Sequence, residues 1–100
     1  MKNEVKKLVK AGICNTDISV LLGIKYDDIK RIITENNLKG AKWNQKAYPY
    51  IYYNRLYNKY YYVMMKSNKK FFYEFENKET LFLSIKNNKW QTPKIIGEYI

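Results

Sequence analysis

The chain contains no histidine and only one cysteine, Cys14, among its 100 residues. The absence of histidine excludes His-based catalytic triads and proton shuttles, and a single thiol excludes an intramolecular disulfide. Zinc sites lose their two usual ligand types, and the acidic residues are too dispersed for metal-dependent phosphodiester cleavage. We therefore expect no enzyme, no metal and no other cofactor, and we interpret Cys14 as a small buried hydrophobe.

The chain also has no uncharged stretch long enough to span a bilayer. The start, Met1-Lys2-Asn3-Glu4, does not resemble a secretory leader. A glycine-rich phosphate loop is absent as well. These absences predict an intracellular protein, cytoplasmic or nucleoid-associated, with no membrane partner.

Acidic residues are scarce, with nine Asp and Glu against nineteen Lys and Arg, which gives a formal charge of +10. Such an excess favours a polyanionic partner, because neutralising phosphates releases counterions. Hydrophobic residues make up 46% of the chain and aromatic residues 17%, which is enough for a packed core. A chain of this length allows one average domain or two small ones.

Residues 16–33 have the pattern of two short helices joined at Gly23. Glycine can adopt the left-handed turn that this joint requires, and the small Ser19 stands where the helices would cross closely. The apolar positions that the geometry requires are filled by Ile18, Leu22, Ile24, Ile29 and Ile32.

Residues 3–38 therefore resemble a helix-turn-helix DNA-binding domain, with helices expected at about 3–11, 16–22 and 26–35. Asp27 and Asp28 suit the positive end of the third helix but would repel a nearby phosphate. An ordinary helical hairpin that reads no DNA stays an alternative. The outward groups of this recognition helix able to reach bases or phosphates are Lys25, Tyr26, Lys30 and Arg31.

From residue 50 onward the sequence becomes dense in aromatic and β-branched residues, as is typical of strands. We expect an antiparallel three-stranded sheet with strands at about 50–54, 60–66 and 70–75. Asn77 would cap a last helix that covers one face of this sheet. The domains are then 1–40 and 50–100, joined by a linker at 41–49. In this linker we expect Trp43 to pack, with stacking or wedging against DNA as the alternative. The tail beyond residue 90 docks on a domain or exchanges between chains.

Side-chain alternation suggests which residues of this sheet face away from the helix. If Tyr61, Val63, Met65 and Phe72 turn inward, an aromatic and basic face points outward, and such a face suits nucleic acid. Packing of this face on the first domain or on a second copy is the alternative. The predicted DNA-binding residues on the outward face and its rim are Arg55, Lys59, Tyr60, Tyr62, Lys66, Lys69, Lys70, Phe71 and Tyr73, with Met64 beside them.

Residues 50–90 also resemble a known family of small DNA-binding domains. The segments that carry the likeness are Ile51 to Arg55, Lys59 to Lys66, Asn68 to Phe75 and Asn77 to Leu81. They are similar to the three-stranded domain of plant ethylene-response factors (the Apetala-two type), whose relatives occur in phage, archaeal and mobile-element proteins and in tyrosine integrases. The resemblance implies a sheet whose helix-free face lies in the major groove of DNA.

The sequence therefore predicts an α+β protein: a three-helix helix-turn-helix followed by a three-stranded antiparallel sheet on one helix. The expected function is duplex DNA binding, as a transcriptional regulator or an accessory factor of a virus or mobile element. A second hypothesis is a small protein that inhibits or recruits a nucleic-acid enzyme through protein contact, and a homodimer is also open. A third is an RNA-binding or single-strand-binding protein.

Overall fold

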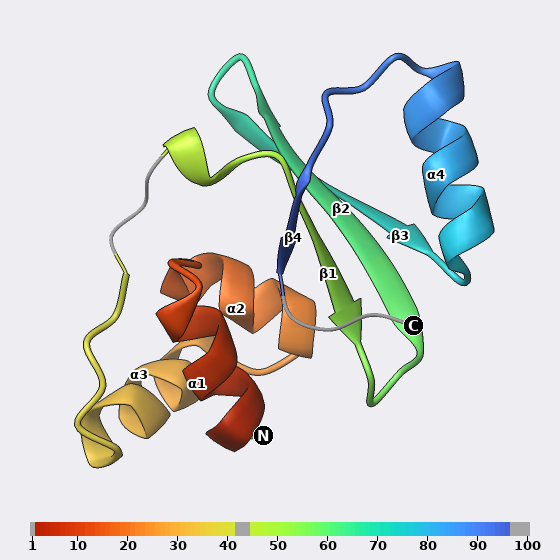
Figure 1. Cartoon of the computed structure of the whole chain (residues 1–100). Helices are drawn as coiled ribbons and strands as arrows, with labels where there is room; N and C mark the ends of the chain where they lie inside the picture. Colours follow the sequence, from red (N-terminus) through yellow and green to blue (C-terminus); the bar gives the residue numbers. More distant parts are fainter. Residues whose placement is uncertain (1, 42–44, 97–100) are drawn as a thin grey trace. The chain divides into compact units, whose positions relative to one another are not determined.

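The computed structural model describes residues 2–41 and 45–96 and has an α+β fold (Figure 1). It divides into two compact units, residues 1–44 and 45–100, and the division falls inside the range 41–49. Residues 45–47 form a 3₁₀ turn, η1. The prediction that Trp43 packs concerns a residue outside the described ones.

The first unit contains the three expected helices: α1 (Lys2–Lys10), α2 (Asn15–Leu22) and α3 (Tyr26–Glu35). Their apolar sides meet in a small core, and Cys14 is buried beside it, as expected. The helices are short, so most of their stability comes from this shared packing. The core side chains are Val5, Leu8, Ile13, Ile18, Leu21, Leu22, Ile29 and Ile33.

Gly23 makes the turn between α2 and α3 in the left-handed conformation, with φ of 65°. The backbone nitrogen of Ile24 donates to the carbonyl of Ser19 at 3.1 Å, which closes the end of α2. The Ser19 hydroxyl in turn donates to the Ile24 carbonyl. A small polar residue at position 19 thus ties the turn to the helix.

The second unit is a sheet with one helix: β1 (Tyr50–Asn54), β2 (Lys59–Lys66), β3 (Lys69–Phe75), α4 (Lys78–Asn87) and β4 (Lys94–Ile96). Strands β1, β2 and β3 form the expected antiparallel meander. The sheet order is β3-β2-β1-β4, and β4 pairs with β1 in parallel. The prediction of a purely three-stranded antiparallel sheet therefore missed β4, which the tail of the chain supplies.

The loops of the meander explain its register. Ser67 and Asn68 form a two-residue turn with φ of 53° and 63°, the left-handed geometry that matches strand twist. In the β1–β2 turn, Asn58 is also left-handed, and its side chain accepts a hydrogen bond from Tyr53 Oη at 2.7 Å. Asparagine, which stands at two of these three positions, tolerates left-handed angles better than most residues.

Helix α4 begins at the expected cap, because Asn77 Oδ1 accepts the backbone N–H of Thr80 at 2.8 Å. It packs on the face of the sheet that carries Ile51, Tyr60 and Tyr62, with Leu81 as its buried contact. The predicted inward set, with Tyr61 and Val63, is on the opposite face. The predicted assignment of the two faces was therefore wrong, because both sets contain aromatic residues and alternation alone does not say which set the helix covers.

Candidate nucleic-acid interface

The exposed side of α3 carries a group of aromatic and basic side chains. Lys25 precedes the helix, Tyr26 opens it with 43% of its surface exposed, and Lys30 follows one turn later. The Lys30 ammonium lies 5.8 Å from the centroid of the Tyr26 ring, as residues four apart on a helix allow. Three of the four predicted α3 residues thus lie together at its amino-terminal half.

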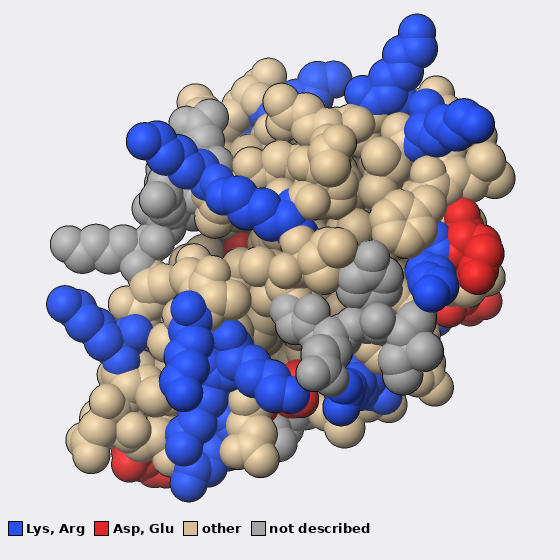
Figure 2. Space-filling model, viewed as in Figure 1, with Lys and Arg blue, Asp and Glu red and all other residues tan. Residues whose placement is uncertain are grey.

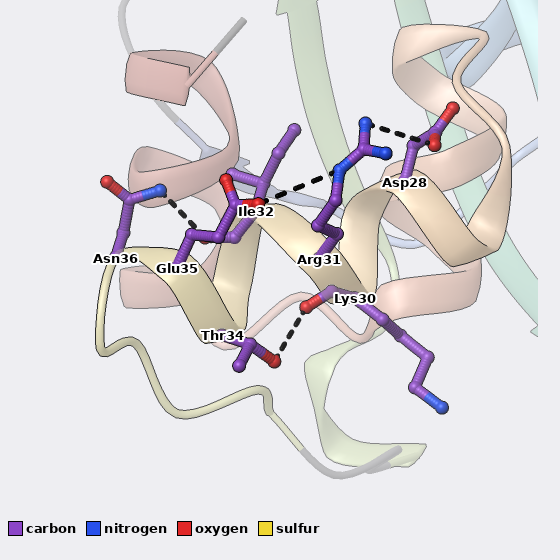
Figure 3. A network of polar contacts seen from close by, with 7 residues as sticks. All are labelled: Asp28, Lys30, Arg31, Ile32, Thr34, Glu35 and Asn36. Atoms are coloured by element: carbon purple, nitrogen blue, oxygen red, sulfur yellow. Dashed lines mark hydrogen bonds and ion pairs between the residues drawn. The ribbon is translucent and has the colours of Figure 1, made fainter.

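Arg31, the fourth predicted residue, points between two carboxylates (Figure 3). Its Nη2 lies 3.2 Å from Asp28 Oδ1, and its Nε lies 3.9 Å from Glu35 Oε1. All three side chains are well exposed, so each ion pair contributes little to stability. The two carboxylates do offset the positive charge that Arg31 could offer to a phosphate. Lys30 points to another side of the helix (Figure 3).

Helix α1 adds basic side chains that the sequence-based site did not include. Val5 and Leu8 are buried, so the lysines of α1 lie on the outer side of the helix. Of these, Lys7 approaches Glu4 at 3.9 Å. The helical spacing of Val5 and Leu8 already predicts an outer position for Lys6, Lys7 and Lys10, and Lys2 is exposed on the same helix.

The predicted basic residues of the second unit lie at opposite ends of the sheet. Arg55 is in the β1–β2 turn, near Lys59, whose ammonium is 3.4 Å from Glu76 Oε1. At the other end, Lys66 and Lys69 face each other across the β2–β3 turn. Lys70 lies there too, 6.0 Å from the ring centroid of Tyr48. These residues form two separate groups rather than one rim.

The predicted aromatic residues are not on a helix-free face. Tyr60 and Tyr62 are 6% and 0% exposed and belong to the core under α4, so the prediction that they point outward was wrong. Phe71 and Tyr73 lie on the same face but are 36% exposed each, because β3 is at the edge of the sheet. Only these two of the predicted sheet aromatics can meet a ligand in this fold.

Burial also sets the acidity of two tyrosines in β2. It raises the pKa of Tyr62, whose hydroxyl donates to the Gln91 carbonyl at 2.8 Å. Burial first, and then the negative charge of Glu74, raise the pKa of Tyr61. Both rings therefore stay neutral beyond the pH at which an ordinary tyrosine ionises.

Trp90 is the aromatic residue of this region that the sequence-based site lacked. It follows α4 directly, and its indole stacks on Tyr62 and on Tyr73, with ring centroids 4.8 Å apart in both pairs. The backbone N–H of Trp90 donates to the Ile85 carbonyl at 3.0 Å, which fixes the end of the helix. No sequence pattern places a residue after the helix against β2 and β3.

On the face drawn in Figure 2, Lys and Arg side chains cover more of the surface than Asp and Glu side chains. Within residues 45–100 ten basic residues stand against four acidic ones. Among the described residues, no group of three or more acidic or cysteine side chains could hold a metal ion. Over the same residues, no helix has the length and apolar character needed to cross a membrane.

A scan of protein-family models, a search of curated proteins and a search of solved structures each give no match to this chain.

Proposed function

We propose that this protein binds duplex DNA through α3 and acts as a transcriptional regulator or an accessory factor of a virus or mobile element. The observation that carries the proposal is the α2–Gly23–α3 turn, which leaves Lys25, Tyr26 and Lys30 exposed on one part of α3. In helix-turn-helix proteins the amino-terminal half of the second helix meets the base edges. Such a protein would work at the nucleoid.

The lysines of α1 and the excess charge of the chain support this proposal as sources of phosphate contacts. The sheet contributes through its basic ends, and no longer through Tyr60 and Tyr62, which are buried. Asp27 and Asp28 stabilise the start of α3 through its dipole, and one of them could accept a hydrogen bond from a cytosine amine.

The double variant Lys25→Ala/Lys30→Ala tests this proposal. We expect it to weaken binding to a labelled duplex by at least about tenfold and to lower the salt slope by about 2, one per lost phosphate contact. The matched control is Lys78→Ala/Lys86→Ala, which removes the same charge from α4. Equal losses in the two double variants, or no binding by the parent protein at low salt, would contradict a reading role for α3.

A second candidate function is protein binding, as an inhibitor or recruiter of a nucleic-acid enzyme. It is favoured by Phe82 and Leu83, which are adjacent on α4 and 42% and 57% exposed. It is also favoured by the carboxylates around Arg31, which oppose phosphate contact. Substitution of Phe82 and Leu83 by serine should leave duplex binding unchanged, whichever of the two functions the protein has. It should abolish inhibition or recruitment of a partner enzyme only if the protein binds that enzyme through this surface.

A further inference from the structure

A groove of about 510 Å³ opens in the second unit, between the β2–β3 turn and the end of α4. Figure 1 shows both at the end of the sheet away from the β1–β2 turn. Its volume is in the range of small-molecule sites, about 300 to 1,000 Å³. We name it the aromatic groove, and its lining includes Tyr48, Tyr62, Tyr73, Trp90, Lys66 and Lys89.

The rings of this groove are held in place before any ligand arrives. Trp90 lies across Tyr62 and Tyr73, which are direct partners in the β2–β3 ladder. The interplanar angles are 21° and 30°, so the indole is stacked on both tyrosine rings. Tyr62 is the buried support, whereas Tyr73 and Trp90 keep part of their surface exposed. A fixed aromatic surface binds a flat ring with little loss of side-chain entropy.

Lysines stand beside these rings. Lys89 follows the end of α4 with φ of 54°, a left-handed conformation in which glycine is the usual residue. A lysine is strained there, yet this position puts an exposed ammonium at the groove. Lys66 and Lys69, both exposed, face each other across the β2–β3 turn. Positive charge therefore borders the aromatic surface on two sides, from α4 and from the turn.

We propose that the aromatic groove binds an unpaired base of single-stranded nucleic acid. The base stacks on the exposed surface of Tyr73 and Trp90, and Lys89 and Lys66 neutralise the phosphates on either side of it. Lys69 lies outside the groove, opposite Lys66 across the β2–β3 turn, so the positive charge continues beyond the site of one nucleotide. A strand with several phosphates fits this charge better than a free nucleotide does. The inference does not depend on duplex binding by α3, which lies in the other unit.

The first test uses the fluorescence of Trp90 in a Trp43→Phe background, where it is the only tryptophan. The probes are an oligonucleotide of ten thymidines, the same backbone with abasic sites in its centre, and thymidine 5′-monophosphate. We expect the first to quench Trp90 and to bind about tenfold or more tightly than the abasic strand, because stacking is lost with the bases. Equal affinity for both strands would overturn base stacking, and a monophosphate that binds as tightly as the strand would overturn the assignment to a strand.

The second test uses Lys89→Gly, which removes the ammonium and relieves the left-handed strain, so the fold should be no less stable. We expect its affinity for the ten-thymidine strand to fall about fivefold, and Tyr73→Ala to lower it about tenfold. Lys86→Ala is the matched control, since it removes a lysine of α4 that does not line the groove. Affinities of Lys89→Gly within twofold of the parent would overturn the role of Lys89. Loss of duplex binding in the α3 variants with strand binding intact separates this proposal from the proposed function.

Discussion

The indole of Trp90 stacks on the ring of Tyr62 with centroids 4.8 Å apart, and this contact joins the end of α4 to the inner strand β2. The Tyr62 hydroxyl reaches past it and donates to the Gln91 carbonyl at 2.8 Å. Together they hold the chain after α4 against the sheet. From there the chain continues to β4, where the backbone nitrogen of Lys94 donates to the Pro49 carbonyl at 3.0 Å.

Tyr62→Ala should destabilise the protein strongly, because the ring is completely buried under α4. We expect a loss of about 3–5 kcal/mol in the free energy of unfolding, against about 1 kcal/mol for Tyr61→Ala on the partly exposed opposite face. Tyr62→Phe should lose only the hydrogen bond to Gln91, about 0.5–1.5 kcal/mol. Urea denaturation of the three variants measures this order, and a larger loss for Tyr61→Ala would contradict the face assignment.

Gly23→Val should destabilise the first unit by about 1–3 kcal/mol, because a β-branched residue is strained at φ of 65°. A Cβ atom at this position would have no neighbouring heavy atom within 4 Å, so the expected cost comes from the backbone conformation. Gly23→Asn is the control, since asparagine tolerates the left-handed region and should lose less. Equal melting temperatures for the valine and asparagine variants would refute the backbone explanation.

Asp28→Asn/Glu35→Gln should release Arg31 from both carboxylates. If α3 contacts DNA, we expect duplex affinity to rise several-fold and the salt slope to increase by about 1. Loss of the Asp28 charge from the first turn should cost about 0.3–1 kcal/mol of stability. Glu74→Gln/Glu79→Gln changes the net charge equally in the second unit and controls for charge alone. An equal rise in duplex affinity in that control would show that the gain comes from net charge and not from a DNA contact by Arg31.

Alkaline pH should destabilise the fold through Tyr61. Its pKa is raised above the ordinary value of 10.0, chiefly by burial and then by Glu74, whose Oε1 lies 3.5 Å from the Tyr61 hydroxyl. The unfolded chain therefore loses this proton first, and the stabilisation present below pH 10 disappears as the pH rises through the folded pKa. Tyr61→Phe should flatten the decline in unfolding free energy between about pH 9 and 11, and Glu74→Gln should flatten it partly. If the unfolding free energy of Tyr61→Phe declined with pH as steeply as that of the parent protein, Tyr61 would not be the cause of the decline.

Local patterns in the sequence were sufficient for the four α-helices and for strands β1, β2 and β3. The spacing of Ile18, Leu22 and Ile29 with Gly23 between them predicts α2, the turn and α3, because a helix and its left-handed end depend on neighbouring residues. The cap at Asn77 and the strand β1 at 50–54 also came directly from the sequence. The same is true of the excess of positive charge, which is independent of the fold.

Only the tertiary structure decided which aromatic residues a ligand can reach. Tyr61 and Tyr62 are neighbouring tyrosines in β2 that point to opposite faces of the sheet, so residue type does not show which face is covered. The docking of α4 and Trp90 is what buries Tyr62. The parallel strand β4 and the carboxylates around Arg31 were likewise missed. The strand depends on a partner more than forty residues away in the chain, and the ion pairs depend on the rotamers of exposed side chains. Neither is encoded by residue type and spacing alone.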